Sequence, residues 1–197
     1  MIKSSEYYRK SIHLFNLVIP FLYFYVFTDK WEYLKILSFI TVCFIIIDIG
    51  RHFVPIIKSI FFFFFDKMLR DHELKGKLTG ATWVMIASCI SIALFSKPVA
   101  ILSLIYMSLG DTAAGLIGQK YGKHRIGTKT WEGFAAGLVV CIIIAINYDM
   151  LPKYISFSGA LFAMIMEILP IPLDDNFKIP LGSGGIMMML LSPIYCL

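Results

Sequence analysis

The chain has 197 residues, of which 58% are hydrophobic and only 16% are charged. A soluble domain of this length needs more charge on its surface, so the composition indicates helices that span a bilayer. The net charge of +5 comes from basic residues spread over separate loops, which argues against a nucleic-acid-binding stripe. The length predicts one polytopic membrane domain over residues 1–197, without a separate soluble catalytic domain.

Seven apolar stretches are each about long enough to cross a hydrocarbon core of ~30 Å as a helix. They cover residues 12–28, 33–50, 79–96, 98–118, 133–148, 154–170 and 179–196. The segment 54–68 contains the run Phe61–Phe65, but it is short and carries three charged residues. Such a segment is typical of an amphipathic or re-entrant helix in the membrane interface. We therefore expect an all-α integral membrane fold with about seven transmembrane helices plus one interfacial or re-entrant helix.

The basic residues favour one orientation of this fold in the membrane. With the N-terminus in the cytoplasm, 14 of the 18 Lys and Arg residues fall on the inner side of seven spans. This bias agrees with the positive-inside rule. Most carboxylates fall on or near the same side, and a carboxylate within a span is costly and usually functional. We expect the active face to be cytoplasmic, and the composition is compatible with a bacterial inner membrane.

The richest stretch of small and polar residues runs from Gly110 to Lys123. Asp111 lies inside an apolar span, and Ala114, Gly118 and Gly122 follow at spacings of four on one helical face. Such a face lets another backbone or a ligand approach closely. One interpretation is a helix-packing seam with an incidental Asp. The other is that Asp111 holds a divalent cation, because Mg²⁺ prefers one or two carboxylates together with substrate phosphate oxygens.

A basic loop follows directly and leads into the next apolar span. Lys123, Arg125 and Lys129 supply positive charge, and the start of a helix supplies free N–H groups for phosphates. Glu132 stands near that start, either as a capping carboxylate or as a second metal or substrate ligand. The plainer interpretation is an ordinary cytoplasmic loop.

Three further polar groups fall on the same predicted face. Asp48 and Arg51 end the second span, at a spacing that permits an ion pair. The other two groups are the segment 69–82 before the third span and the Asp174–Asn176 triplet before the last. Each could be a solvated loop by itself, but their convergence predicts a site.

Taken in chain order, these residues resemble the CTP-dependent polyprenol kinase family, which includes dolichol kinase, phytol kinase and CTP-dependent diacylglycerol kinase. The matching pieces are Arg9-Lys10-x-x-His13, Asp48-x-x-Arg51, Leu69-Arg70-x-x-Glu73, Thr79-Gly80-Ala81-Thr82, Gly110-Asp111-Thr112-Ala113-Ala114, Glu132-Gly133 and Asp174-Asp175-Asn176. The resemblance implies transfer of the γ-phosphate of CTP to the hydroxyl of a lipid alcohol: a polyprenol, phytol or diacylglycerol. It also implies Mg²⁺ or another divalent cation. The lipid acceptor and the oligomeric state stay open.

The resemblance further implies roles for individual residues. The catalytic group consists of Asp111, Glu73 and Asp48. The nucleotide-binding group consists of Lys123, Arg125, Lys129, Thr130, Asp175 and Asn176. The metal group consists of Asp111, Glu132 and Asp174. The group at the lipid head consists of Arg9, Lys10, His13 and Arg70. Which carboxylate acts as the general base is left open.

Two other functions compete with a kinase. The stretch Lys129-Thr130-Trp131-Glu132-Gly133 also resembles phosphatidate cytidylyltransferases, in which a phosphatidate oxygen attacks the α-phosphorus of CTP and pyrophosphate leaves. The C-terminal stretch Ile179–Gly185 lacks the His of that family's Pro-Gly-His-Gly-Gly element, which favours the kinase. An ion-coupled transporter using Asp111 would show polar residues near the midplane and a repeated half, and neither is visible.

Overall fold

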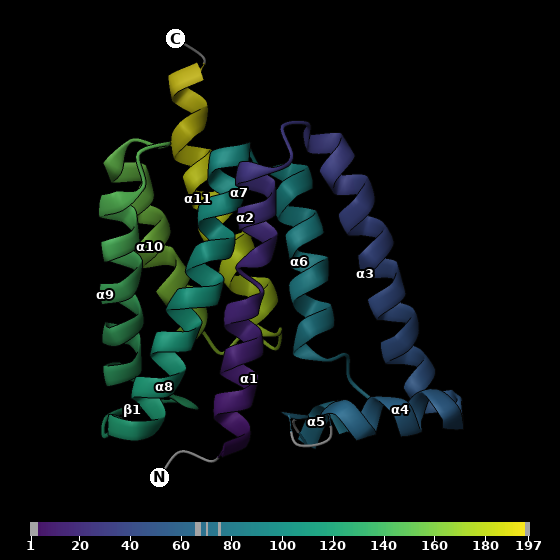
Figure 1. Ribbon diagram of the computed structural model, residues 1–197. Coiled ribbons are helices and arrows are strands. Elements are labelled where there is room, and N and C mark those ends of the chain that lie inside the picture. The colour runs from purple at the N-terminus through teal and green to yellow at the C-terminus, as the bar shows by residue number, and fades with distance from the viewer. Residues whose placement is uncertain (1–3, 66–67, 70, 75, 196–197) are drawn as a thin grey trace.

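The computed structural model describes residues 4–65, 68–69, 71–74 and 76–195 of the chain. These residues form a bundle of long helices that stand side by side, with one helix lying across its lower end (Figure 1). In chain order the elements are α1 (Ser4–Phe15), α2 (Val18–Tyr25), α3 (Lys30–Phe53), α4 (Pro55–Phe65), α5 (Asp71–Leu74), α6 (Gly80–Leu94), α7 (Lys97–Ile105), the π-helical turn η2 (Tyr106–Gly110), α8 (Asp111–Tyr121), β1 (Arg125–Ile126), β2 (Lys129–Thr130), α9 (Trp131–Asn147), α10 (Lys153–Ile168) and α11 (Asp175–Tyr195).

The prediction of a helical fold is confirmed, and each apolar stretch marked in the sequence lies mainly in one helix or in consecutive helices. Among the described residues, Lys30–Phe53 and the continuous helical stretch Lys97–Tyr121 are by length and composition able to cross a membrane. Pro55–Phe65, Gly80–Leu94 and Trp131–Asn147 are shorter apolar helices. The number of seven spans stays a prediction. The hairpin β1–β2, where only a loop was expected, is an addition to the all-α prediction.

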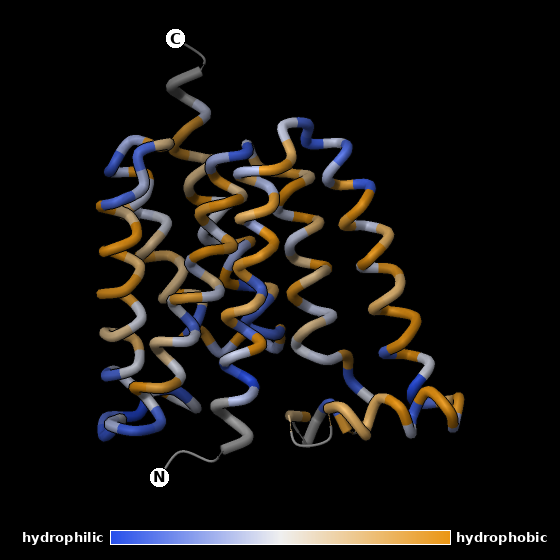
Figure 2. Tube along the Cα trace, in the orientation of Figure 1, coloured by the Kyte–Doolittle hydropathy of each residue, from blue (hydrophilic) through white to orange (hydrophobic). Residues whose placement is uncertain are grey.

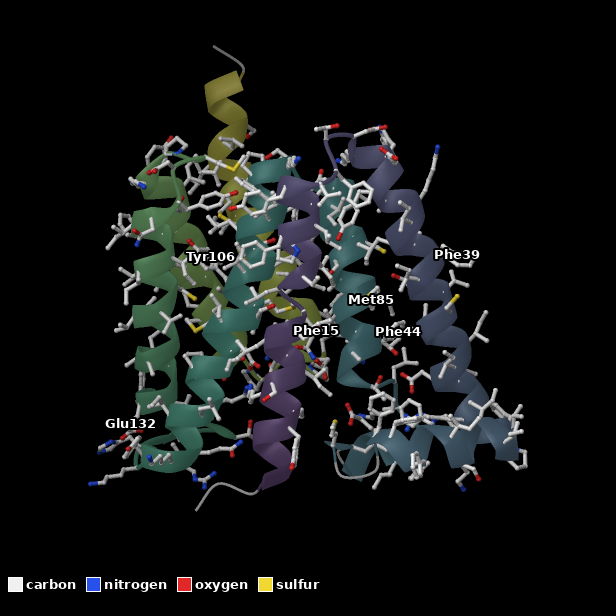
Figure 3. The ribbon with its side chains drawn as sticks, in the orientation of Figure 1. Phe15, Phe39, Phe44, Met85, Tyr106 and Glu132 are labelled. Atoms are coloured by element: carbon white, nitrogen blue, oxygen red, sulfur yellow. The ribbon has the colours of Figure 1, made fainter. Side chains whose placement is uncertain are left out.

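The apolar surface of the bundle is compatible with a lipid environment. Figure 2 shows hydrophobic residues along the middle of the helices and hydrophilic residues mainly at their two ends. On α3, Phe39 points away from the bundle and is 71% exposed (Figure 3). Because a soluble monomer rarely exposes such an extended apolar surface, this face of α3 is suited to contact with lipid tails.

Helix α4 occupies most of the segment 54–68, for which the sequence predicts an interfacial or re-entrant helix. It lies across the lower ends of the neighbouring helices (Figure 1), and none of its residues is buried. Phe63 is 84% exposed and Phe64 is 63% exposed. This orientation is the one expected of a helix that lies along a membrane surface with its aromatic rings in the interface.

The core lies where α6, α7, η2, α10 and α11 meet. Tyr106 of η2 is completely buried, and its hydroxyl donates to the carbonyl oxygen of Ser156 in α10 at 2.8 Å (Figure 3). A π-helical turn widens a helix locally and is frequently found beside functional residues. Here it is followed directly by Asp111, the first residue of α8.

Candidate functional site

Asp111 is the centre of a buried ion-pair cluster between α8 and α1. The Lys10 ammonium lies 2.6 Å from Asp111 Oδ2 and also donates to the Asp111 carbonyl oxygen at 3.0 Å. The ring nitrogen Nε2 of His13 lies 3.3 Å from the same Oδ2 and 3.1 Å from the Met107 carbonyl oxygen. Lys10, His13 and Asp111 are each at most 7% exposed. A carboxylate so buried is stable only with such partners.

The small residues of α8 allow α1 and the start of α9 to pack closely against it. A Cβ at Gly115 would lie 2.7 Å from Cε of Lys10, so the glycine makes room for the lysine stem. A Cβ at Gly133 of α9 would lie 2.7 Å from the Ala114 carbonyl oxygen, and one at Gly118 would lie 2.8 Å from Thr130 Oγ1. The packing-seam interpretation is therefore correct for α8 and α9, while Asp111 has partners of its own on α1.

The hairpin β1–β2 presents Lys129 to α10 and α11. Ile126 pairs with Lys129 across a two-residue turn in which Gly127 has φ of +58°. A positive φ at this position is typical of the tight turns that join two strands. The Lys129 ammonium lies 2.8 Å from Oε1 of Glu167 and 2.6 Å from Oδ2 of Asp175.

The charge on Lys129 is favoured by three carboxylates. Burial opposes the charged form, but the negative charges of Asp175, Asp111 and Glu167 outweigh it and hold the Lys129 pKa above its ordinary value. Lys178 adds a second ammonium, 3.0 Å from Asp175 Oδ1. The hairpin lysine is thus electrostatically linked to both Asp111 and the start of α11.

A cavity of about 420 Å³ opens between the hairpin and the segment that connects α10 to α11. Its lining includes Lys129, Lys178, Asp175 and Glu167 together with apolar side chains of both segments. Binding pockets for small molecules commonly combine this size with mostly apolar walls and a few placed polar groups. The cavity therefore offers a ligand both apolar surface and charged groups.

A second polar cluster fixes the beginning of α6. Asp48 Oδ2 accepts hydrogen bonds from the Thr79 amide at 2.7 Å, the Thr79 hydroxyl at 3.0 Å and the Thr82 hydroxyl at 2.7 Å. Arg51 Nε lies 2.7 Å from Asp48 Oδ1, and Arg51 donates to the Glu73 carbonyl oxygen at 2.9 Å. Glu73 Oε1 accepts from the Gly80 amide at 2.8 Å. Asp48 and Glu73 are thus engaged in holding backbone, which suits them to positioning.

The triplet Asp174–Asn176, at the start of α11, connects the two clusters. The side-chain amide of Asn176 donates to the Gly80 carbonyl oxygen at 3.2 Å, next to the amide that Glu73 holds. Asp174 Oδ1 accepts from the Asn176 amide at 3.0 Å, as a capping carboxylate does at a helix start. Asp175, Asn176 and Lys178 therefore lie between the second cluster and the cavity.

Other residues predicted for the site are exposed, half-buried or paired with residues outside the Asp111 cluster. Glu132 Oε1 lies 2.7 Å from His124 Nδ1, near the lower end of α9 (Figure 3), and gives no contact with Asp111. Thr130 Oγ1 accepts from the Gly133 amide at 3.1 Å, so this side chain caps α9. Lys123 and Arg125 are exposed. Arg9 is half-buried, and Arg70 lies outside the described residues.

Within the described ranges, no three His, Cys, Asp or Glu side chains come together as a metal site. The predicted set of Asp111, Glu132 and Asp174 is therefore not assembled. Glu167 and Lys178 were missed as site residues, although Glu167 is a carboxylate inside a predicted span and the structure buries it to 3% exposure. That position in an apolar stretch was the available signal.

The chain is similar to several curated proteins that are named as lipid kinases. CTP-dependent diacylglycerol kinase 1 of Saccharomyces cerevisiae is 26% identical over 224 residues, covering 94% of this chain and 77% of that protein. The corresponding protein of Schizosaccharomyces pombe is 26% identical over 146 residues, which cover 63% of this chain and 65% of that protein. The names of these relatives support a resemblance between the chain and the CTP-dependent polyprenol and lipid kinases.

A probable phytol kinase 2 of Glycine max is also similar, at 26% identity over 160 residues, or 71% of this chain. The chain spans about half, 54%, of that phytol kinase. No family model and no solved structure matches the chain.

Proposed function

We propose that this protein is a membrane lipid kinase that transfers the γ-phosphate of CTP to the hydroxyl of a lipid alcohol. The acceptor class is a polyprenol, phytol or diacylglycerol, as the names of the relatives suggest. The observation that carries the proposal is the buried Asp111 with Lys10 and His13, linked through Lys129 to a polar cavity.

The residues of the cluster have the charges that phosphoryl transfer requires. Catalysis of this reaction is almost entirely positioning and electrostatic stabilisation. Lys10, Lys129 and Lys178 supply three ammonium groups for the phosphate oxygens of CTP. The lipid oxygen forms a bond to the γ-phosphorus, the bond from that phosphorus to the β-phosphate oxygen breaks, and CDP leaves.

The hydroxyl proton needs an acceptor at the point of attack. Asp111 is the residue in this cluster best suited to orient the hydroxyl and accept its proton, with His13 beside it. Lys10, which contacts Asp111 here, then becomes available to the transferred phosphate. The positioning roles of Asp48 and Glu73 follow from their contacts with the start of α6.

The described carboxylates fit a magnesium ion that arrives with the nucleotide. Mg²⁺ is usually held by one or two carboxylates together with substrate phosphates and waters, and not by a cage made of protein alone. Asp174 and Asp175 at the start of α11 would supply such carboxylates, whereas Glu132, which pairs with His124, would not. When bound, the ion neutralises charge on the triphosphate.

The lipid would approach from the side of α1. Phe15 follows Lys10 and His13 on this helix and is 72% exposed (Figure 3). An apolar tail lying along this surface would bring its hydroxyl to the level of Asp111. The assignment of Arg9, Lys10 and His13 to the lipid head group is thereby kept, with Lys10 and His13 also contacting the catalytic carboxylate.

An experiment with CTP labelled at one phosphorus distinguishes phosphoryl transfer from cytidylyl transfer. The purified protein in lipid is incubated with Mg²⁺ and CTP labelled at the α- or the γ-phosphorus, with diacylglycerol, a polyprenol or phosphatidate as acceptor. A kinase labels lipid from γ-labelled CTP alone, whereas a cytidylyltransferase labels it from α-labelled CTP. Asp111→Asn should abolish the labelling, and Asp149→Asn, at an exposed pair with Lys153, is the matched control. Full activity of a folded Asp111→Asn protein would contradict the proposal.

We also propose seven spans with the N-terminus and the site on the cytoplasmic side of the membrane, in a bacterial inner membrane. After replacement of the native cysteines, Lys123→Cys and Lys153→Cys place single thiols on opposite sides of the predicted bundle. An impermeant thiol reagent should label the protein with Cys at 153 from outside and the one with Cys at 123 only in inverted vesicles. Labelling of both from one side would contradict this topology.

A further inference from the structure

Glu167 has a carboxylate oxygen for which the described residues provide no partner. The residue lies in the last turn of α10, is 3% exposed, and its Oε1 accepts a hydrogen bond from the Lys129 ammonium at 2.8 Å. Its Oε2 is buried and, within the described part of the chain, accepts no hydrogen bond. An acceptor left unsatisfied in this way carries a full desolvation cost, so it points to a donor on a ligand.

The surroundings of Glu167 indicate what kind of donor this is. The residue lines the 420 Å³ cavity, whose walls include the apolar side chains of Ile126, Leu169 and Leu173. Lys129 and Lys178 line the same cavity. An ammonium has three N–H donors, and the contacts of Lys129 with Glu167 and Asp175 use two. The cavity thus offers apolar surface, ammonium donors and one carboxylate oxygen, Oε2 of Glu167, that no described residue occupies, since both oxygens of Asp175 contact lysines.

These groups complement the hydrogen-bonding edge of cytosine, but not that of uracil. Cytosine carries an exocyclic N4 amino group, which donates, beside ring N3 and O2, which accept; Glu or Asp is the usual acceptor for N4. Uracil has a carbonyl oxygen in place of the amino group, and a carboxylate oxygen repels it. A carboxylate paired with ammonium donors therefore selects cytosine over uracil.

We propose that this cavity is the cytosine pocket of the enzyme and that Glu167 Oε2 accepts a hydrogen bond from the N4 amino group, which makes Glu167 the residue that determines CTP specificity. The inference rests on the proposed kinase function and goes further, because it assigns a binding site to the cytosine ring of CTP. Lys129 contacts Glu167, and its charge interacts with Asp111, so the triphosphate would extend from the cavity toward Asp111.

The test compares three nucleotides in the wild-type protein and in Glu167→Gln. They are CTP, UTP and the triphosphate of pyrimidin-2-one riboside, which lacks any substituent at position 4. The glutamine keeps an acceptor for Lys129 and adds a donor. We expect the preference in kcat/KM for CTP over UTP to fall by about 10- to 100-fold, the effect of losing one charge-assisted hydrogen bond and one repulsion. Asp149→Asn is the control and should keep the wild-type preference.

The pyrimidinone nucleotide isolates the amino group. Wild-type protein should use CTP better than this analogue, and Glu167→Gln should lose most of that difference. A variant that slows with all three nucleotides by one factor would show that Glu167 is only a counter-ion of Lys129, and would overturn the inference while leaving the kinase function intact.

Binding gives a readout that is independent of turnover. CTP should raise the melting temperature of the wild-type protein more than UTP does, and Glu167→Gln should remove this difference. If wild-type protein transfers no phosphate, the kinase proposal fails, and the melting temperatures still decide whether the cavity reads cytosine. Should Glu167→Gln fail to fold, Leu173→Trp is the second variant, because Leu173 is 46% exposed at the cavity. It should raise KM for CTP at least tenfold, and an unchanged KM would overturn the placement.

Discussion

The ammonium of Lys10 and the carboxylate of Asp111 lie 2.6 Å apart across a separation of 101 residues in the chain. This pair ties α1 to α8, the helix that carries the proposed catalytic carboxylate. Breaking a buried ion pair by removing one partner typically costs about 3–5 kcal/mol, because the other charge is left uncompensated. Lys10→Met should therefore lower the melting temperature strongly and abolish activity.

The double variant Lys10→Met/Asp111→Leu separates stability from chemistry. An apolar pair often restores the stability that a single removal loses. We expect the melting temperature to recover and the activity to stay absent. Recovery of activity together with stability would show that the pair is only structural.

Arg51 should not tolerate replacement by lysine. Its guanidinium contacts the Asp48 carboxylate and donates to the carbonyl oxygens of Glu73 and Lys77, and its side chain is 1% exposed. A lysine keeps the charge but cannot reproduce this planar fork. Arg51→Lys should cost roughly 1–3 kcal/mol, measured by thermal unfolding in detergent. Lys58→Arg, at an exposed position on α4, should have no effect.

The close packing of α9 against η2 gives a further stability prediction. A Cβ at Gly137 would lie 2.9 Å from the Gly110 carbonyl oxygen, which is backbone and cannot turn away, and would also meet the Met164 sulfur. Gly137→Ala should destabilise the protein by about 1–3 kcal/mol. At Gly185 in α11 an added Cβ meets nothing within 4 Å. Gly185→Ala should leave stability unchanged or raise it by up to about 1 kcal/mol, and equal losses at both positions would contradict this close packing.

The environment of Lys129 predicts a dependence on alkaline pH. Its pKa is higher in the folded protein than in the unfolded chain, because the carboxylates of Asp175, Asp111 and Glu167 outweigh burial. Its stabilising contribution is complete below the ordinary lysine pKa of about 10.4 and is lost as the pH rises through the raised value.

The measurement is the difference in melting temperature between wild-type protein and Lys129→Met. That difference should stay constant from pH 7 to about 10 and shrink at higher pH. Lys153→Met, at an exposed pair with Asp149, should give a small difference throughout, since such pairs contribute little. A constant difference into strong alkali would contradict the role given to the three carboxylates.

The sequence predicted the helices, because apolar length is a local feature. The interfacial position of α4 and the catalytic role of Asp111 stay predictions, although the structure gives Asp111 buried partners. The sequence did not predict the contact between Lys10 and Asp111, since no spacing rule relates positions 101 apart. The hairpin was missed because strands of two residues are too short for an alternating pattern.

The role of each residue in the site was harder to predict than which residues belong to the site. Thr130 and Glu132 stand in a motif that suggests ligands, yet Thr130 caps α9 and Glu132 pairs with His124. A cap and a ligand use the same side chains, and only packing decides between them. Glu167 was passed over because no motif surrounds it; its significance comes from a hairpin lysine 38 positions away.

The turn η2 sets the rotational phase between the two halves of one long helix. Each residue of an α-helix turns the chain by about 100°. A π-helical turn fits one extra residue into a single turn of helix. Deleting one residue from Tyr106–Gly110 would therefore restore regular α-helix and leave Asp111 facing Lys10 nearly as before. A deletion between Asp111 and Gly118, where the helix is regular, would instead rotate Gly118 away from Gly133 by that angle. The second deletion should inactivate the protein, whereas the first should be better tolerated.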